Sequence, residues 1–160
     1  MTIASCIIFV AKKETANDLF IFMKENNHKA SILHSDLENQ ARDILMDKFR
    51  NGESKVLITT NVLARGIDIP SVSLVVNYDL PTMPHPSNKG LYVADPSTYV
   101  HRIGRTGRFG RPGVAVSFVS DAQSKKVLDD IKGYYPDIEI QQLPNDDIDE
   151  LEKMVKNLFK

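Results

Sequence analysis

This sequence has few cysteines and no long hydrophobic run. Cys6 is the single cysteine, so no disulfide can form within the chain, which suits a reducing compartment. The longest apolar runs, CIIFVA and VSLVV, are far too short to cross a bilayer. Met1 precedes no basic segment, and we expect no secretory signal. The sequence therefore predicts no membrane partner, and Cys6 reads as a small buried apolar residue rather than a nucleophile.

An excess of charge of one sign is also absent. Lys and Arg number 20 and Asp and Glu 21, giving a formal net charge of −1. Composition alone therefore does not predict nucleic-acid binding, which would depend on where the basic residues fall. With 160 residues, 42% apolar and 26% charged, the sequence is typical of one globular domain, which we place at 1–160.

Short apolar runs alternate with longer segments of helical periodicity. We expect strands at 6–11, 30–34, 55–60, 73–78, 113–119 and 138–143. Helices are expected at 14–27, 38–50, 96–107, 122–134 and 146–159. This alternation predicts an α/β fold, a mainly parallel sheet with helices on both faces. The acidic start of the last helix reads as a solvated helix terminus, so we predict no metal site.

One long segment does not follow the alternation. Residues 81–96 hold four of the eight prolines, together with Asn88 and Gly90. Residues of these types favour turns, so we expect an extended surface loop.

Four arginines recur at a spacing of three in the stretch YVHRIGRTGRFGRPG, residues 99–113. They are Arg102, Arg105, Arg108 and Arg111, and glycines run in parallel with them. Each glycine costs a helix about 1 kcal/mol relative to alanine, so propensity does not explain the pattern. Glycine lets a backbone approach a ligand closely, and the arginine fork matches phosphate oxygens. A solvated basic face is the alternative at this point.

Polar residues follow several of the predicted strands at the end where parallel sheets bind ligands. The segment TTNVLARGIDIP follows strand 55–60, NYDLP ends strand 73–78, and HSD ends strand 30–34. Arg42 lies one helical turn into the next segment. We therefore expect a polar and basic rim at the carboxyl ends of the strands.

These segments carry a family resemblance. In order and spacing, IIFVA, LHSDLENQAR, TTNVLARGID, VVNYDLP and YVHRIGRTGRFGRPG resemble the motifs of the second RecA-like domain of DEAD-box RNA helicases. The match runs over nearly the whole chain. The extended loop at 81–96 and the ending NDDIDELEKMVKNL resemble most the nuclear-pore-associated subfamily of messenger-RNA export. The sequence departs from the family at Ser35, usually glycine, and at Asn39, often glutamine.

The resemblance implies a role for each motif residue. Arg105 and Arg108 would be catalytic residues that reach the γ-phosphate of ATP, while Gly66 and Asp68 would face the nucleotide. The interdomain residues would be His101, Arg102 and Arg65. RNA phosphates would contact Arg42, Thr60, Ser35 and the backbone at Val10 and Ala11, whatever the base sequence. Arg111 stays outside this site as solvated surface.

The resemblance also implies what the chain lacks. No G-x-x-x-x-G-K-[ST] loop and no D-E-A-D tetrad occur in the sequence, so ATP and Mg²⁺ would be held mostly by an N-terminal ATPase domain absent from this chain. The isolated domain would then be inactive. The implied partners are single-stranded RNA, that N-terminal RecA-like domain, and an export activator bridged by inositol hexakisphosphate. We expect a monomer in the cytoplasm and nucleus, including the cytoplasmic face of the nuclear pore.

Two other functions remain open from the residues alone. One is a stand-alone, non-catalytic module that binds RNA or a protein on a RecA-like scaffold, which the missing phosphate loop would suit. The other is a flavodoxin-like nucleotide binder, which the arginine run disfavours.

Overall fold

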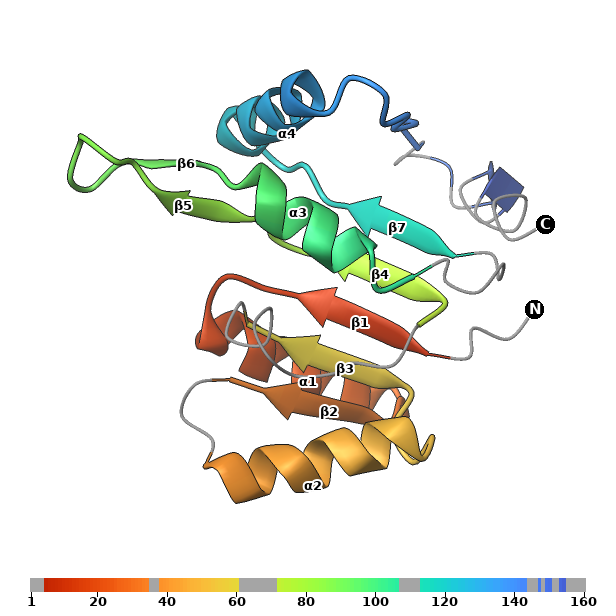
Figure 1. Cartoon of the computed structure of the whole chain (residues 1–160). Coiled ribbons are helices and arrows are strands. Elements are labelled where there is room, and N and C mark those ends of the chain that lie inside the picture. The colour runs from red at the N-terminus through yellow and green to blue at the C-terminus, as the bar shows by residue number, and fades with distance from the viewer. Residues whose placement is uncertain are drawn as a thin grey trace.

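A five-stranded parallel sheet forms the centre of the domain. The computed structural model describes residues 5–34, 38–60, 72–106, 113–143, 147, 149–150 and 153–154 (Figure 1). The strand order is β2-β3-β1-β4-β7, and every neighbouring pair is parallel. The strands are β1 Cys6–Phe9, β2 Ala30–Leu33, β3 Val56–Thr59, β4 Leu74–Asn77 and β7 Val114–Ser117. The predicted α/β class and parallel sheet are confirmed.

The central strand β1 is buried along its whole length, as its unbroken apolar run predicts. Ile7 pairs with Leu57 on one side and with Val75 on the other. All three side chains are 0% exposed and belong to the core on one face of the sheet.

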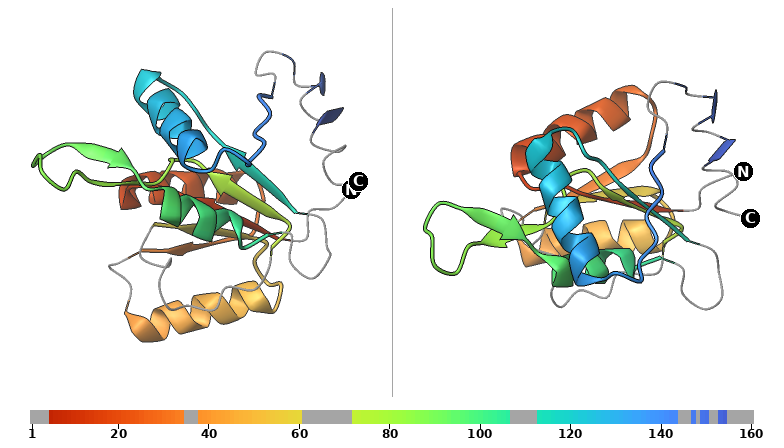
Figure 2. Two further views of the ribbon diagram at one scale, coloured as in Figure 1. Left: turned by 45° about the horizontal axis from the view of Figure 1, so that its top comes forward. Right: turned by 90° about the horizontal axis from the view of Figure 1, so that it is seen from above.

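Helices α1 Lys13–Glu25 and α2 Asn39–Arg50 cover opposite faces of the sheet (Figure 2). On one face, α1 places Ala16 against Ile8 and Ile58. On the other, α2 places Met46 and Phe49 in the core that contains Phe9. The amphipathic spacing of each helix thus becomes a buried stripe.

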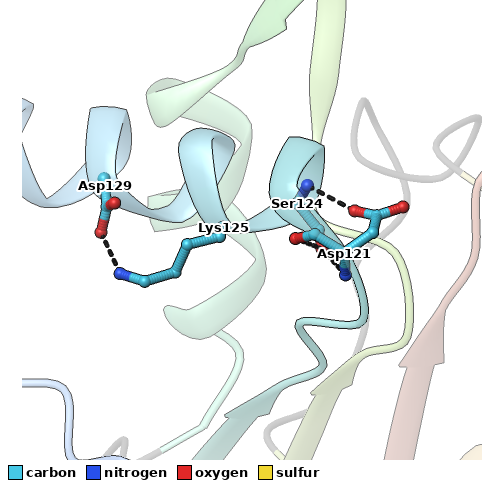
Figure 3. A network of polar contacts seen from close by, with 4 residues as sticks. All are labelled: Asp121, Ser124, Lys125 and Asp129. Atoms are coloured by element: carbon cyan, nitrogen blue, oxygen red, sulfur yellow. Dashed lines mark hydrogen bonds and ion pairs between the residues drawn. The ribbon is translucent and has the colours of Figure 1, made fainter.

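The last two described helices pack against each other beside β4 and β7. They are α3 Pro96–Ile103 and α4 Ala122–Tyr134. Tyr99 from α3 and Leu128 and Ile131 from α4 share one apolar cluster. Asp121 and Ser124 form a capping box at the start of α4, and Lys125 pairs with Asp129 one turn later (Figure 3).

Residues 81–96, expected to be a loop, instead contain a β-hairpin. Strands β5 Thr82–Pro84 and β6 Tyr92–Ala94 pair antiparallel. In the turn, His85 Nδ1 accepts hydrogen bonds from the backbone N–H groups of Ser87 and Asn88, each at 3.0 Å. The hairpin projects beyond the sheet in both figures (Figures 1 and 2). Proline at Pro84 is compatible with this pairing because both strands are edge strands.

The strand predicted at 138–143 is wrong, since these residues are irregular in the structure. Their alternating apolar pattern is satisfied differently: Ile138 and Ile140 pack half-buried against the cluster between α3 and α4. The helix predicted at 146–159 lies largely outside the described residues. Within the part of the chain that the structure describes, no helix is long and apolar enough to cross a membrane.

Candidate nucleotide and RNA interface

Helix α3 runs from the side of the sheet where the strands end, the carboxyl-terminal edge, to the side where they begin, the amino-terminal edge. Its start is fixed near the carboxyl ends of the strands, where the Asp95 N–H donates to the Pro81 carbonyl at 3.0 Å. Asp95 also caps the helix by accepting from the Thr98 N–H at 3.1 Å. The far end reaches the beginning of β4 (Figure 1).

Arg105 lies at this amino-terminal edge. Its carbonyl accepts from the Val72 N–H at 2.9 Å, and the Thr106 hydroxyl donates to the Val72 carbonyl at 2.6 Å. The Arg105 side chain is half-buried, and the exposed His101 lies one turn earlier on α3. Because these bonds hold the backbone at Arg105 against Val72, just before β4 begins, the base of the Arg105 side chain has a fixed position.

The described part of the expected rim lies on the opposite side of the sheet, where the strands end. Val10 follows β1 at its carboxyl end, and Thr60 follows β3. Val10 is 0% exposed and Thr60 is 7% exposed. The Thr60 N–H donates to the Leu33 carbonyl at 3.2 Å. Its buried hydroxyl has no hydrogen-bond partner among the described residues. Arg42 lies half-buried in the first turns of α2, which follows the carboxyl end of β2.

The backbone at the end of β1 is already bonded within the domain. The Val10 N–H donates to the Thr59 carbonyl at 3.0 Å, as a ladder bond of the sheet. The Ala11 N–H donates to the carboxylate of Asp79 at 2.8 Å. A phosphate that approached this backbone would therefore meet one N–H held by the sheet and one held by an acid.

Arg102 is buried inside the domain, at 2% exposed, which differs from the expectation that it faces a second domain. Its Nη1 donates to the Asn77 side-chain oxygen at 3.0 Å and to the Asp79 carbonyl at 2.9 Å. Burial lowers the pKa of Arg102 to about 10, while the charges of Asp79 and Asp95 act in the opposite direction. Arg102 therefore stays charged at neutral pH.

Asn77 extends this network to the next strand. Its side-chain nitrogen donates to the Ser117 hydroxyl at 3.2 Å. Tyr99 bonds the same serine, and burial raises the pKa of the Tyr99 hydroxyl against the lowering effect of that bond. One polar network therefore links α3 with β4 and β7. The signal for this network is NYD, residues 77–79, a polar cluster that directly follows an apolar run.

Comparison with known proteins identifies the family. Residues 2–110 match the model of the helicase conserved C-terminal domain. The chain belongs to this family. An ATP-dependent RNA helicase DBP5 of Kluyveromyces lactis is 62% identical over 160 residues, which are 100% of this chain and 33% of the relative. The chain thus spans about a third of the length of the curated relatives it matches.

Solved structures agree with this helicase C-terminal domain in fold. The structure of the C-terminal domain of the DEAD-box protein Dbp5 is 62% identical, with a TM-score of 0.88 over 98% of this chain and 84% of that chain. A variant C-terminal domain of Saccharomyces cerevisiae Dbp5 bound to Gle1 and IP6 is 60% identical, with a TM-score of 0.86 over 99% and 85%. S. cerevisiae Dbp5 bound to RNA and ADP BeF3 is 61% identical, with a TM-score of 0.85 over 99% and 39%. The expected RecA-like helicase fold is confirmed.

Several predicted site residues of this helicase domain lie outside the described residues. They are Arg108, Gly66, Asp68, Arg65 and Ser35. Their assigned roles stay predictions. Among the described site residues, Arg105 and His101 lie toward one edge of the sheet, and Val10, Thr60 and Arg42 lie at the other. The structure therefore divides the predicted site into two separate parts that share α3 and the sheet.

Proposed function

We propose that this chain is the C-terminal domain of an ATP-dependent DEAD-box RNA helicase that remodels RNA or RNA–protein complexes. One observation carries the proposal: the arginine-bearing end of α3 and the polar ends of β1 and β3 occupy opposite edges of one sheet. The relatives support a helicase over a stand-alone module, because they are about three times as long as this chain. The chain alone lacks the phosphate-cradling loop that ATP turnover needs.

The amino-terminal edge would serve ATP. Arg105, with Arg108, Gly66 and Asp68, would face the nucleotide, and the guanidinium fork would bind γ-phosphate oxygens. ATP with Mg²⁺, when bound, supplies the phosphoryl group that is transferred to water. The phosphate loop and the metal ligands would come from an N-terminal RecA-like domain of the same polypeptide. This division makes nucleotide binding the event that joins the two domains.

The carboxyl-terminal edge would serve single-stranded RNA. Arg42 offers a cation there and Thr60 a hydroxyl. Ser35 and the backbone around Val10 and Ala11 would complete the phosphate contacts, through the Ala11 N–H, because the Val10 N–H is used by the sheet. Contacts to the phosphodiester carry no base information, so binding would be independent of RNA sequence. The buried Thr60 hydroxyl, which lacks a partner among the described residues, is a donor that a phosphate oxygen would satisfy.

An export activator would dock on this domain, bridged by inositol hexakisphosphate. The support is the similar Dbp5 C-terminal domain solved with Gle1 and IP6. The resemblance to the nuclear-pore subfamily supports a role of the full protein in messenger-RNA export, and its proposed location is the cytoplasm and nucleus, including the cytoplasmic face of the pore. Pull-down with the activator, with and without inositol hexakisphosphate, tests the bridge, and equal capture in both removes it.

The helicase function is tested by comparing two proteins. The full-length polypeptide encoded by the same gene should hydrolyse ATP faster when RNA is added, whereas the 160-residue chain should show no RNA-stimulated hydrolysis. Steady-state ATPase assays with purified proteins measure this. Turnover by the 160-residue chain alone would contradict the division of the active site between two domains.

A further inference from the structure

The Ala11 N–H at the end of β1 already donates a hydrogen bond to an anionic side chain of the protein itself. The Ala11 N–H donates to Asp79 Oδ2 at 2.8 Å, although 68 residues separate the two in sequence. Ala11 and the following Lys12 are both exposed. A backbone N–H on the surface, next to a lysine, is the kind of group that binds a phosphate oxygen. Here a carboxylate oxygen takes that place.

The backbone of Asp79 is held by hydrogen bonds that do not involve its side chain, so the carboxylate can move away from Ala11 while the main chain keeps its place. The Asp79 N–H donates to the Phe9 carbonyl at 3.3 Å, and its own carbonyl accepts from Arg102 at 2.9 Å. These two bonds fix the main chain between β1 and α3. Asp79 is half-exposed, and the hydrogen bond that its carboxylate accepts from Ala11 is open to solvent. Rotation about its side-chain bonds is therefore enough to free the Ala11 N–H.

We propose that the Asp79 carboxylate is an internal competitor of RNA, which must displace it from the Ala11 amide to bind at the end of β1. This inference rests on the proposed RNA function of that edge. Carboxylate and phosphate oxygens are both anionic acceptors of a single N–H, and two anions at one donor repel each other. Asp79 thus lowers the affinity of the domain for RNA and satisfies the amide when RNA is absent.

A purely structural role for Asp79 predicts the opposite effect. If the carboxylate serves to hold the connection between β1 and α1 in shape, removing its charge weakens RNA binding or leaves it unchanged. Asp79→Asn separates the two roles. Its side-chain oxygen still accepts a hydrogen bond from Ala11, while the negative charge is gone.

The first experiment compares binding of a fluorescein-labelled oligouridylate to the wild-type chain and to Asp79→Asn. At low salt, Asp79→Asn should bind about fivefold tighter, which corresponds to one unit-charge repulsion at roughly 4 Å in water. The difference should shrink as salt is raised. Asp137→Asn removes the same charge from an exposed position on the turn after α4 and should change the affinity by less than twofold. Thermal unfolding of each variant confirms that it is folded.

A second measurement needs no substitution. In the ¹⁵N-labelled wild-type chain, oligouridylate should move the amide resonance of Ala11, because its acceptor changes. If the wild type binds and Asp79→Asn binds no tighter, or if the Ala11 resonance stays fixed at saturation, the competitor role is overturned and the RNA function stands. If neither chain binds oligouridylate at low salt, the proposed RNA function of this domain fails, and the competitor role with it.

Discussion

The guanidinium carbon of Arg102 lies 4.7 Å from the centre of the Phe9 ring. A cation over an aromatic face is favourable, more so when water is excluded, and both side chains are 2% exposed. The contact joins the last turn of α3 to the end of the central strand. Arg102, for which the family resemblance implies an interdomain role, is therefore also part of the core between α3 and the sheet.

Replacing Arg102 by Met should destabilise the domain strongly. The change leaves the Asn77 side-chain oxygen and the Asp79 carbonyl without their charged donor, so the free energy of unfolding should fall by about 3 kcal/mol. Arg102→Lys keeps the charge but loses the fork, and should recover part of the loss. Urea unfolding measures both. Arg50→Met, which removes an exposed arginine paired with Asp47, is the control and should cost less than about 1 kcal/mol.

The burial of Arg102 is a feature that could not be predicted from the sequence, whereas most of the helices and strands could be. The periodic apolar runs correctly predicted the parallel sheet and the four described helices, because burial on two faces imposes those periods. The same reasoning placed a strand at 138–143, where the alternation is used to pack against helices. Of the rim predicted at the carboxyl ends of the strands, the described residues Thr60, Asp79 and Arg42 lie on that side of the sheet, because parallel strands all end there. Residues 35–37 and 61–71 lie outside the described residues. The burial of Arg102 could not be predicted, since it depends on Asn77 and Phe9, whose contacts are set by tertiary packing.

Arg105→Ala in the full-length protein should lower kcat for ATP hydrolysis by orders of magnitude. Arginine fingers contribute about 10³ to 10⁵ in rate by neutralising charge on the γ-phosphoryl oxygens. The backbone bond of Arg105 to Val72 does not need the side chain, so the fold should persist. RNA affinity without nucleotide should change little.

Two companion variants sharpen the ATPase measurement. Arg105→Lys should recover only part of the rate, because an ammonium lacks the fork. Arg111→Ala should cost little in either assay. Near wild-type hydrolysis by Arg105→Ala would show that this arginine is only basic surface.

Asp121 predicts a pH dependence of stability. Hydrogen bonds from Ser124 hold the pKa of the Asp121 carboxyl below its ordinary value of 3.8 (Figure 3). The charged form is thus favoured in the folded state, and its contribution is present above pH 3.8 and is lost as the pH falls through the lower, folded-state pKa. Asp121→Asn keeps a capping oxygen without a titrating group. The wild type should therefore lose stability relative to Asp121→Asn on acidification.

Thermal unfolding at pH values from 7 down to 2 measures this difference. Asp130→Asn, on the same helix and without a capping role, serves as the control for a general loss of negative charge. Parallel melting curves for wild type and Asp121→Asn over the whole range would contradict the assigned role of the cap.

Cys6 should be unreactive in the folded chain. Burial raises the pKa of its thiol to about 12, so almost no thiolate exists at pH 8, and the side chain is only 7% exposed. A thiol reagent should label the protein at the rate of unfolding and quickly in urea. Labelling of the native chain within seconds at pH 8 would place Cys6 in an accessible site instead.

The central position of β1 has a consequence for biosynthesis. Among the strands of this domain it is the first to be synthesised, yet its two neighbours are β3 and β4, and Ser5 finds its partner Ser73 only 68 residues later. Until Asn77 has emerged, the four residues Cys6–Phe9, which are buried in the folded domain, form an apolar segment with an unpaired edge. Pairing across such long separations is slow compared with helix formation. The nascent chain should therefore depend on chaperone protection while the first half of this domain is synthesised, whereas the completed domain does not.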